Sequence, residues 1–128
     1  LVAQNDALAR SPLGGMLDHV RVPEDHAGPP LLWLGPRDTL TPFHYDPTDV
    51  LVLQLHGRKR WQLIAPTDRA WATRVGDATR TLLTPLAGDG VAVEEHVLAA
   101  GDAIEVPAGY WHRVVALDAS ITLSLPKR

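Results

Sequence analysis

Proline and glycine interrupt this chain every few positions, and this limits the length of any regular element that it can form. The sequence contains 11 Pro and 10 Gly among 128 residues. Because proline ends helices and central strands and glycine favours turns, this spacing favours short strands over long helices. The length and the 45% hydrophobic content fit one core, so we expect residues 1–128 to form a single domain.

The composition also excludes several classes of protein. The net charge is −3, and the basic residues are scattered apart from Arg58-Lys59-Arg60, so we do not expect nucleic-acid binding. Without cysteine there is no disulfide framework, and any metal must be held by His, Asp or Glu. No apolar run approaches the roughly 18 residues of a membrane span, and no signal segment is visible. We therefore expect a cytoplasmic protein.

The chain divides into a lead-in and a β-rich core. Residues 1–30 predict a short helix over 1–10 followed by loop, and residues 31–125 predict a barrel core. The runs 50–55 and 60–64, separated by a turn at Gly57, predict a β-hairpin, and residues 67–88 predict an excursion with weak helical turns. The expected strands are 31–34, 50–55, 60–64, 91–93, 96–98, 103–106, 113–115 and 121–125. Seven or eight short strands and one minor helix favour an all-β barrel or sandwich.

Two histidines lie within sequence segments that suggest a metal site. In His44-Tyr45-Asp46, side chains two residues apart project from the same face of an extended strand, so both can reach one ion. His112 follows the tight turn predicted by Pro107 to Trp111 and is our best candidate for a third ligand. Two histidines and one carboxylate form the arrangement that leaves positions on Fe(II) open for a cosubstrate and dioxygen.

A rival ligand set lies later in the chain. Glu94, Glu95 and His96 are adjacent and offer suitable donor atoms, but they lack a partner at a distance along the sequence. The remaining histidines are interpreted as surface or packing residues. We therefore favour His44, Asp46 and His112.

Several ordered motifs resemble a known family. They are Trp33-Leu34-Gly35-Pro36, the segment 41–47, Gly57-Arg58-Lys59-Arg60, Gly101-Asp102, the segment 106–112 and the segment 117–121. Together they resemble the JmjC and cupin-like Fe(II)/2-oxoglutarate oxygenases, in the hydroxylase branch that includes the asparaginyl hydroxylase of hypoxia-inducible factor. The resemblance implies a double-stranded β-helix, also called a jelly-roll or cupin barrel. It also implies that His44, Asp46 and His112 hold the iron.

The resemblance further implies residues that bind the cosubstrate. Lys59 stands where the family places the lysine that pairs with the distal carboxylate of 2-oxoglutarate, and Thr41 stands where a hydroxyl joins it. Without the resemblance, a lysine between two arginines is typical of a solvated cation. Trp33 has the parity to face inward and is expected either to wall the cosubstrate pocket or to pack in the core. The alternating hydroxyls Ser120, Thr122 and Ser124 could line the same cavity.

Two departures from the family pattern concern the cosubstrate pocket. Val50 stands where many relatives carry an asparagine near the other carboxylate of the cosubstrate, so that contact is altered or absent here. The start at Leu1 leaves out the N-terminal strands of the family, which favours a fragment in which part of the cosubstrate pocket is missing.

The function that these observations favour is hydroxylation of a C–H bond by an Fe(II)/2-oxoglutarate-dependent oxygenase that consumes dioxygen. A protein or peptide substrate is the first expectation, and a small molecule is a close second. Two alternatives stay open. One is a metal-dependent cupin enzyme that does not use 2-oxoglutarate, such as an isomerase, a lyase or another dioxygenase, which the Val50 departure supports. The other is a non-catalytic, metal-binding cupin module.

Overall fold

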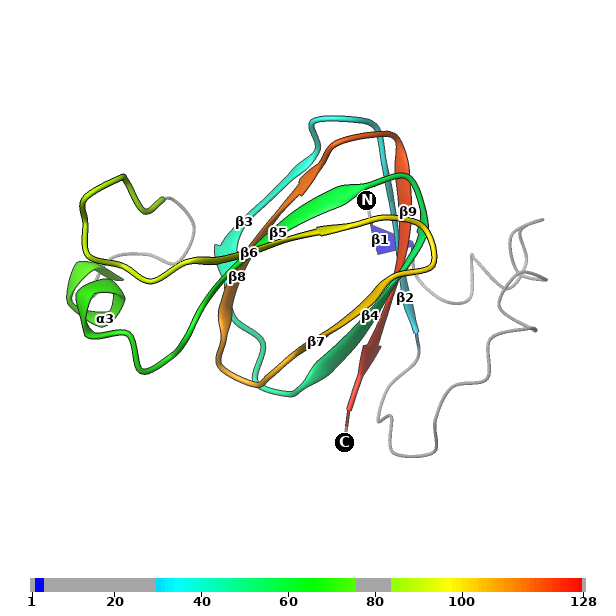
Figure 1. The fold of residues 1–128 in the computed structure, drawn as a ribbon. Coiled ribbons are helices and arrows are strands. Elements are labelled where there is room, and N and C mark those ends of the chain that lie inside the picture. Colours follow the sequence, from blue (N-terminus) through cyan, green and yellow to red (C-terminus); the bar gives the residue numbers. More distant parts are fainter. Residues whose placement is uncertain (1, 4–29, 76–83, 128) are drawn as a thin grey trace.

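The computed structural model describes residues 2–3, 30–75 and 84–127, and these residues are almost entirely β-structure (Figure 1). Within these ranges the chain forms one short helix, α3 (Arg69–Val75). The strands are β1 (Val2–Ala3), β2 (Leu31–Gly35), β3 (Leu40–His44), β4 (Val50–His56), β5 (Lys59–Ile64), β6 (Glu94–Leu98), β7 (Ala103–Val106), β8 (Trp111–Ala116) and β9 (Ser120–Pro126). The described part of the chain has no helix that is long and apolar enough to cross a membrane.

The strands form two antiparallel sheets that face each other across a common interior (Figure 1). One sheet has the order β1-β2-β9-β4-β7, and the other has the order β3-β8-β5-β6. From β2 to β9, successive strands change sheet at every step except β5 to β6. This winding is the double-stranded β-helix that the sequence predicts, and the fold prediction is confirmed.

The predicted hairpin of 50–55 and 60–64 is wrong, because β4 and β5 lie in different sheets. Strand β4 pairs with β7 and β9, whereas β5 pairs with β6 and β8. Each strand needs to bury one face, and they do so by packing Val52 against the same core as Trp61 instead of pairing their edges. The chain crosses between the sheets at Gly57, whose φ of 66° suits glycine.

A buried glutamine holds this crossing in place. The Gln54 amide donates to the carbonyls of His56 (2.7 Å) and Gly57 (3.2 Å). Its oxygen accepts a hydrogen bond of 3.0 Å from the Thr122 hydroxyl on β9. The polar groups exposed by the turn are thereby satisfied inside the protein, where an unpaired group would be costly.

Two further predictions on secondary structure need correction. The helix expected over residues 1–10 is not formed at Val2–Ala3, which make strand β1 and bond to the edge of β2. At Val2–Ala3, backbone hydrogen bonds to the open edge of the sheet take the place of hydrogen bonds within a helix. Residue 1 and residues 4–29 of the expected helix and loop lie outside the described residues. The strand expected over 91–93 is not formed. The ladder with β5 begins at Glu94, which pairs with Leu63, so β6 corresponds to the strand expected over 96–98 and starts two residues earlier. That residues 1–128 form one domain remains a prediction.

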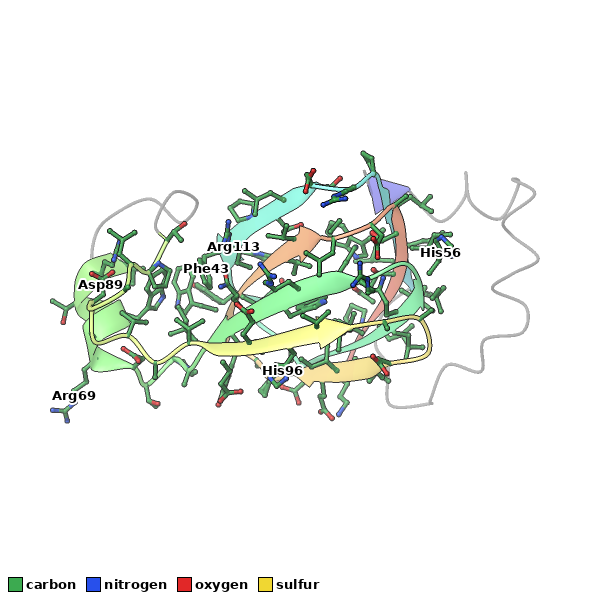
Figure 2. The ribbon with its side chains drawn as sticks, turned by 45° about the horizontal axis from the view of Figure 1, so that its top comes forward. Phe43, His56, Arg69, Asp89, His96 and Arg113 are labelled. Carbon is green, nitrogen blue, oxygen red and sulfur yellow. The ribbon has the colours of Figure 1, made fainter. Side chains whose placement is uncertain are left out.

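The helical turns predicted within 67–88 are confirmed by α3, which lies beside the four-stranded sheet (Figure 1). Its start is capped by the Asp68 carboxylate, which accepts from the backbone N–H of Trp71 at 2.8 Å. Trp71 is fully buried and contacts Phe43 of β3, with ring centroids 5.1 Å apart. Figure 2 shows Phe43 on the side of the barrel that faces the helix. Helix α3 therefore supports the strand that ends at His44.

Candidate active site

His44 and His112 lie opposite each other on neighbouring strands. They are register partners in the β3–β8 ladder, and their ring centroids are 4.1 Å apart. Asp46 follows closely after β3, and its Oδ2 lies 3.7 Å from Nε2 of His112. One ligand atom from each of the three side chains lies within 4.8 Å of the others. In the ranges that the structure describes, no other trio of His, Asp or Glu side chains meets this condition.

Both imidazoles are oriented in the same way by the backbone. Nδ1 of His44 is 2.9 Å from the carbonyl oxygen of Pro42, and Nδ1 of His112 is 3.1 Å from that of Tyr110. Because a carbonyl only accepts, each Nδ1 carries the proton that it donates. This assignment leaves the lone pair on Nε2 of each ring, and Nε2 of His112 is the atom that faces Asp46.

The environment of His112 keeps its imidazole neutral. The residue is 5% exposed, and burial is the main cause that lowers its pKa, with the nearby His44 lowering it further. The Tyr110 carbonyl and the Asp46 carboxylate raise the pKa but do not reverse the shift. Trp61 of β5 stacks on the His112 ring, with centroids 5.9 Å apart and planes 26° apart. A neutral imidazole is the form that binds a metal.

Trp61 was not among the site residues predicted from the sequence. Its spacing of two residues from Lys59 on β5 is the signal that could have identified it, since residues so spaced share one face of a strand. Tyr45 and Trp111, the sequence neighbours of the ligand candidates, contact each other edge to face with centroids 5.1 Å apart. Neither of them lines the cavity at the His cluster.

Asp46 is placed differently from the sequence expectation. Strand β3 ends at His44, so Asp46 lies in the turn between β3 and β4 and not on the strand itself. Pro47 follows it and has no N–H for a ladder hydrogen bond, which disfavours extension of β3. The turn still brings the carboxylate to the imidazoles, but by its own geometry and not by strand alternation.

The three side chains fit a divalent first-row metal such as Fe(II). Two neutral imidazole nitrogens and one carboxylate oxygen are a donor set that such ions accept, and the ligand atoms are already gathered within 4.8 Å. All three residues lie on the wall of one cavity, so ligands from outside the protein can approach the same point. The three side chains can therefore bind one side of an ion and leave the side that faces the cavity open to other ligands.

The cavity has a volume of about 370 Å³ and occupies part of the interior between the two sheets. This size is in the range of small-molecule sites. All six residues singled out from the sequence line it: Trp33, Thr41, His44, Asp46, Lys59 and His112. Its remaining lining is mostly apolar and includes Val50, Val52, Trp61, Val106 and Val114.

Lys59 faces this cavity, whereas the arginines beside it are bound elsewhere. Arg58 donates to Asp118 at 2.7 Å, and Arg60 lies 3.3 Å from Glu95. Lys59 is half-buried, and burial lowers its pKa from 10.5 to about 8. Among residues 30–75 and 84–127, no carboxylate lies within 4.0 Å of its ammonium group. The solvated-cation interpretation therefore does not describe Lys59.

The last strand contributes hydroxyls to the same interior. Thr122 and Ser124 line the cavity, as the polar face of the strand suggested, while Ser120 is buried outside it. Trp33 also lines the cavity, and its buried indole N–H has no hydrogen-bond partner among the described residues. Of the two interpretations of Trp33, the position on the cavity wall is the one that the structure supports.

The rival set does not form a comparable site. Glu94, Glu95 and His96 are all exposed on β6, at the edge of the four-stranded sheet, and Figure 2 shows His96 on this strand. Nε2 of His96 lies 3.7 Å from Glu94, whereas Glu95 bonds to Gln62 at 3.0 Å. Because neighbouring side chains on a strand point to opposite faces, the three do not converge.

Comparison with known proteins shows which family this chain resembles. The family described as "JmjC domain" matches residues 32–128. The chain is 34% identical over 104 residues to Jumonji C domain-containing protein 5 of Drosophila melanogaster, covering 72% of this chain and 26% of that protein. It is 36% identical over 72 residues to ribosomal oxygenase 2 of Rattus norvegicus, covering 56% of this chain and 14% of that protein.

A third relative is the bifunctional lysine-specific demethylase and histidyl-hydroxylase NO66 of Drosophila persimilis, with 33% identity over 72 residues, or 56% of this chain and 10% of that protein. The chain thus spans about a tenth to a quarter of the length of these curated relatives. Among solved structures, the Escherichia coli ribosomal oxygenase YcfD matches 84% of this chain and 25% of that chain, with a TM-score of 0.61 and 21% identity. This last likeness supports the fold.

Proposed function

The chain belongs to the JmjC domain family, and on that premise we propose that it is an Fe(II)- and 2-oxoglutarate-dependent oxygenase that hydroxylates a C–H bond of a protein or peptide. One observation carries the proposal. His44, Asp46 and His112 converge on the wall of a cavity that also contains the half-buried cation Lys59. A metal site and an anion site within one cavity are what an iron enzyme with a dicarboxylate cosubstrate requires.

In this proposal His44, Asp46 and His112 hold Fe(II). The two imidazoles offer Nε2 lone pairs because their Nδ1 protons are bound to backbone carbonyls. The Asp46 carboxylate partly neutralises the charge of the ion. Bound Fe(II) would supply the oxidation of a substrate C–H bond by dioxygen, coupled to conversion of 2-oxoglutarate to succinate and carbon dioxide.

Lys59 and Thr41 bind the distal carboxylate of 2-oxoglutarate in this proposal. A half-buried ammonium without a carboxylate partner among the described residues gains more from an incoming anion than a fully solvated one does, because its surroundings screen the charge less. Thr41 lies on the same cavity wall and offers a hydroxyl donor. Trp33 and the valines of the wall keep this part of the cavity apolar and favour exclusion of water.

The nature of the substrate is inferred from the relatives. Their names include a histidyl-hydroxylase, a lysine-specific demethylase and a ribosomal oxygenase, and the first two name amino-acid side chains as targets. These names support a protein or peptide substrate more than a small molecule. A net charge of −3 gives no reason to prefer a nucleic acid.

One observation favours a second candidate function. Val50, Val52 and Val106 form an apolar part of the cavity wall. Val50 stands where the family resemblance implies an asparagine near the cosubstrate. A metal-dependent cupin enzyme that does not use 2-oxoglutarate would not need a polar group there. A metal-binding module without turnover would not need one either.

Calorimetric titration of 2-oxoglutarate into anaerobic, Mn(II)-loaded protein separates these candidates. We expect saturable binding that the Lys59→Ala variant weakens by at least tenfold, since the proposed charge partner of the distal carboxylate is lost. Arg60→Ala is the matched control, because Arg60 is adjacent but pairs with Glu95 at the surface, and it should bind like the parent. Metal binding without any 2-oxoglutarate binding would contradict the oxygenase and favour the second candidate.

A further inference from the structure

The three candidate ligands are not held equally well by the sheet. His44 and His112 are fixed by the ladder between β3 and β8, in which they are register partners. Asp46 lies beyond the last residue of β3 and has no partner in that ladder. Its side chain is 41% exposed, so packing alone does not fix it either. Some other contact must hold the turn that carries Asp46 near His112.

The structure contains such a contact in the turn before β8. The backbone N–H of Gly109 donates to the carbonyl of Asp46 at 2.9 Å. Three residues after Asp46, the Asp49 carboxylate accepts from the backbone N–H of Ala108 at 2.7 Å. The turn that bears Asp46 is thereby tied twice to the turn that leads into His112. We call this pair of hydrogen bonds, together with residues 46–49 and 107–109, the turn clasp.

A third bond anchors the clasp to the opposite sheet. The backbone N–H of Lys127, just after β9, donates to the carbonyl of Asp49 at 2.8 Å. The Lys127 side chain in turn forms an ion pair with Glu105 of β7. The Asp49 side chain therefore joins the two turns to each other. Its backbone carbonyl joins them to the five-stranded sheet. Removing its carboxylate leaves the backbone bonds but frees Ala108.

We propose that Asp49 is a positioning residue that sets the separation of Asp46 and His112 at the metal site. This inference rests on the proposed function, because it assumes that these side chains hold a metal. Asp49 does not line the cavity and would act through its bond to the turn before β8. Residues that orient metal ligands typically change metal affinity by about 10- to 100-fold when they are lost.

Titration with Co(II) alone tests the proposal by calorimetry and by visible absorption, with four variants. Asp49→Ala removes the acceptor for the Ala108 N–H, whereas Asp49→Asn keeps an oxygen that can accept the same bond. Asp102→Ala is the matched control, because Asp102 also accepts a backbone N–H in a turn, that of Ala99 at 2.8 Å, but this turn carries no ligand candidate. Asp46→Ala supplies the reference spectrum for loss of the carboxylate ligand.

We expect Asp49→Ala to bind Co(II) about 10- to 100-fold more weakly than the parent and to give an absorption spectrum shifted toward that of Asp46→Ala. Asp49→Asn should stay within about threefold of the parent, and Asp102→Ala should match the parent. Parental affinity in Asp49→Ala, or an equal loss in Asp102→Ala, would overturn the positioning role while leaving the metal site intact. If the parent itself binds no Co(II), the proposed function and this inference both fail.

Discussion

The imidazole rings of His44 and His112 face each other with centroids 4.1 Å apart, although the two residues come from distant parts of the chain. Both are held as metal-binding tautomers by carbonyls two residues earlier in the sequence. Together with the Asp46 carboxylate, the two rings gather three potential ligand atoms within 4.8 Å of one another. This relationship has a direct consequence for stability.

A bound divalent metal should stabilise the folded protein. At a free Co(II) or Mn(II) concentration of about 100 times the Kd, the free energy of unfolding should rise by about 2.7 kcal/mol, because the metal binds the folded state alone. Thermal denaturation followed by circular dichroism should show the Tm rising by roughly 10 °C. His44→Ala should lose this increase, whereas His96→Ala, which alters an exposed histidine, should keep it. An equal increase in both variants would show that the metal binds elsewhere.

Affinity for 2-oxoglutarate should fall as the pH rises through about 8. Lys59 has its pKa lowered from 10.5 to about 8 by burial, so its charge is lost at mildly alkaline pH in the unliganded protein. Binding of the dianion needs the protonated amine, and each complex formed above pH 8 must take up a proton. Calorimetry of the Mn(II)-loaded protein between pH 6.5 and 9 measures this dependence.

The matched variant for that experiment is Lys59→Arg, which keeps a positive charge that does not titrate below about pH 12. Its affinity for 2-oxoglutarate, even if lower, should not change over the same pH range. Identical pH profiles for the parent and Lys59→Arg would mean that a different group titrates, and Lys59 would not be the anion partner.

Replacing Lys59 by methionine should stabilise the protein at neutral pH. The pKa of Lys59 is lower in the folded than in the unfolded state, so folding below pH 8 includes the cost of burying a charged amine. After allowance for solvent screening, Lys59→Met should raise the free energy of unfolding by about 1–2 kcal/mol at pH 7. Urea denaturation without metal or cosubstrate measures this difference.

The sign of the pH dependence provides a check on that result. Between pH 8 and 10.5 the unfolded state binds more protons at Lys59 than the folded state does, so the parent becomes more stable with rising pH. The advantage of Lys59→Met should therefore shrink over this window. Arg60→Met, at the exposed neighbour, should change stability by less than about 0.5 kcal/mol. If Lys59→Met were less stable than the parent at pH 7, the prediction would be refuted.

The crossing at Gly57 should tolerate no side chain. A Cβ added there would lie 2.2 Å from the carbonyl oxygen of Ala119, and the φ of 66° is strained for alanine. Gly57→Ala should destabilise the protein by about 3 kcal/mol or more, measured by urea denaturation. Gly90→Ala is the control, because Gly90 has a similar φ of 71° but no atom within 4 Å of an added Cβ. It should lose only about 1 kcal/mol, and equal losses would assign the effect to the backbone angle alone.

The sequence alone is sufficient to predict the β character of the barrel and most of its strands. Alternating burial in β4 and β8 follows from the way successive side chains of a strand point to opposite faces, which is a local property of the strand. The same alternation, together with the family resemblance, selected six of the residues that line the cavity. These inferences need only the order of residues within short segments.

Other features depend on which segments meet, and the sequence pattern does not specify that. A short turn at Gly57 suggested a hairpin, but β4 and β5 entered opposite sheets, because both can bury their apolar faces against one core. The stacking of Trp61 on His112, the lowered pKa of Lys59 and the bond from Ala108 to Asp49 likewise arise from pairings between distant segments. Residue type and spacing thus determined which side chains could share a face. Only the tertiary structure decided which faces meet and how the turn with Asp46 is held, since strand pairing and burial are properties of the whole chain.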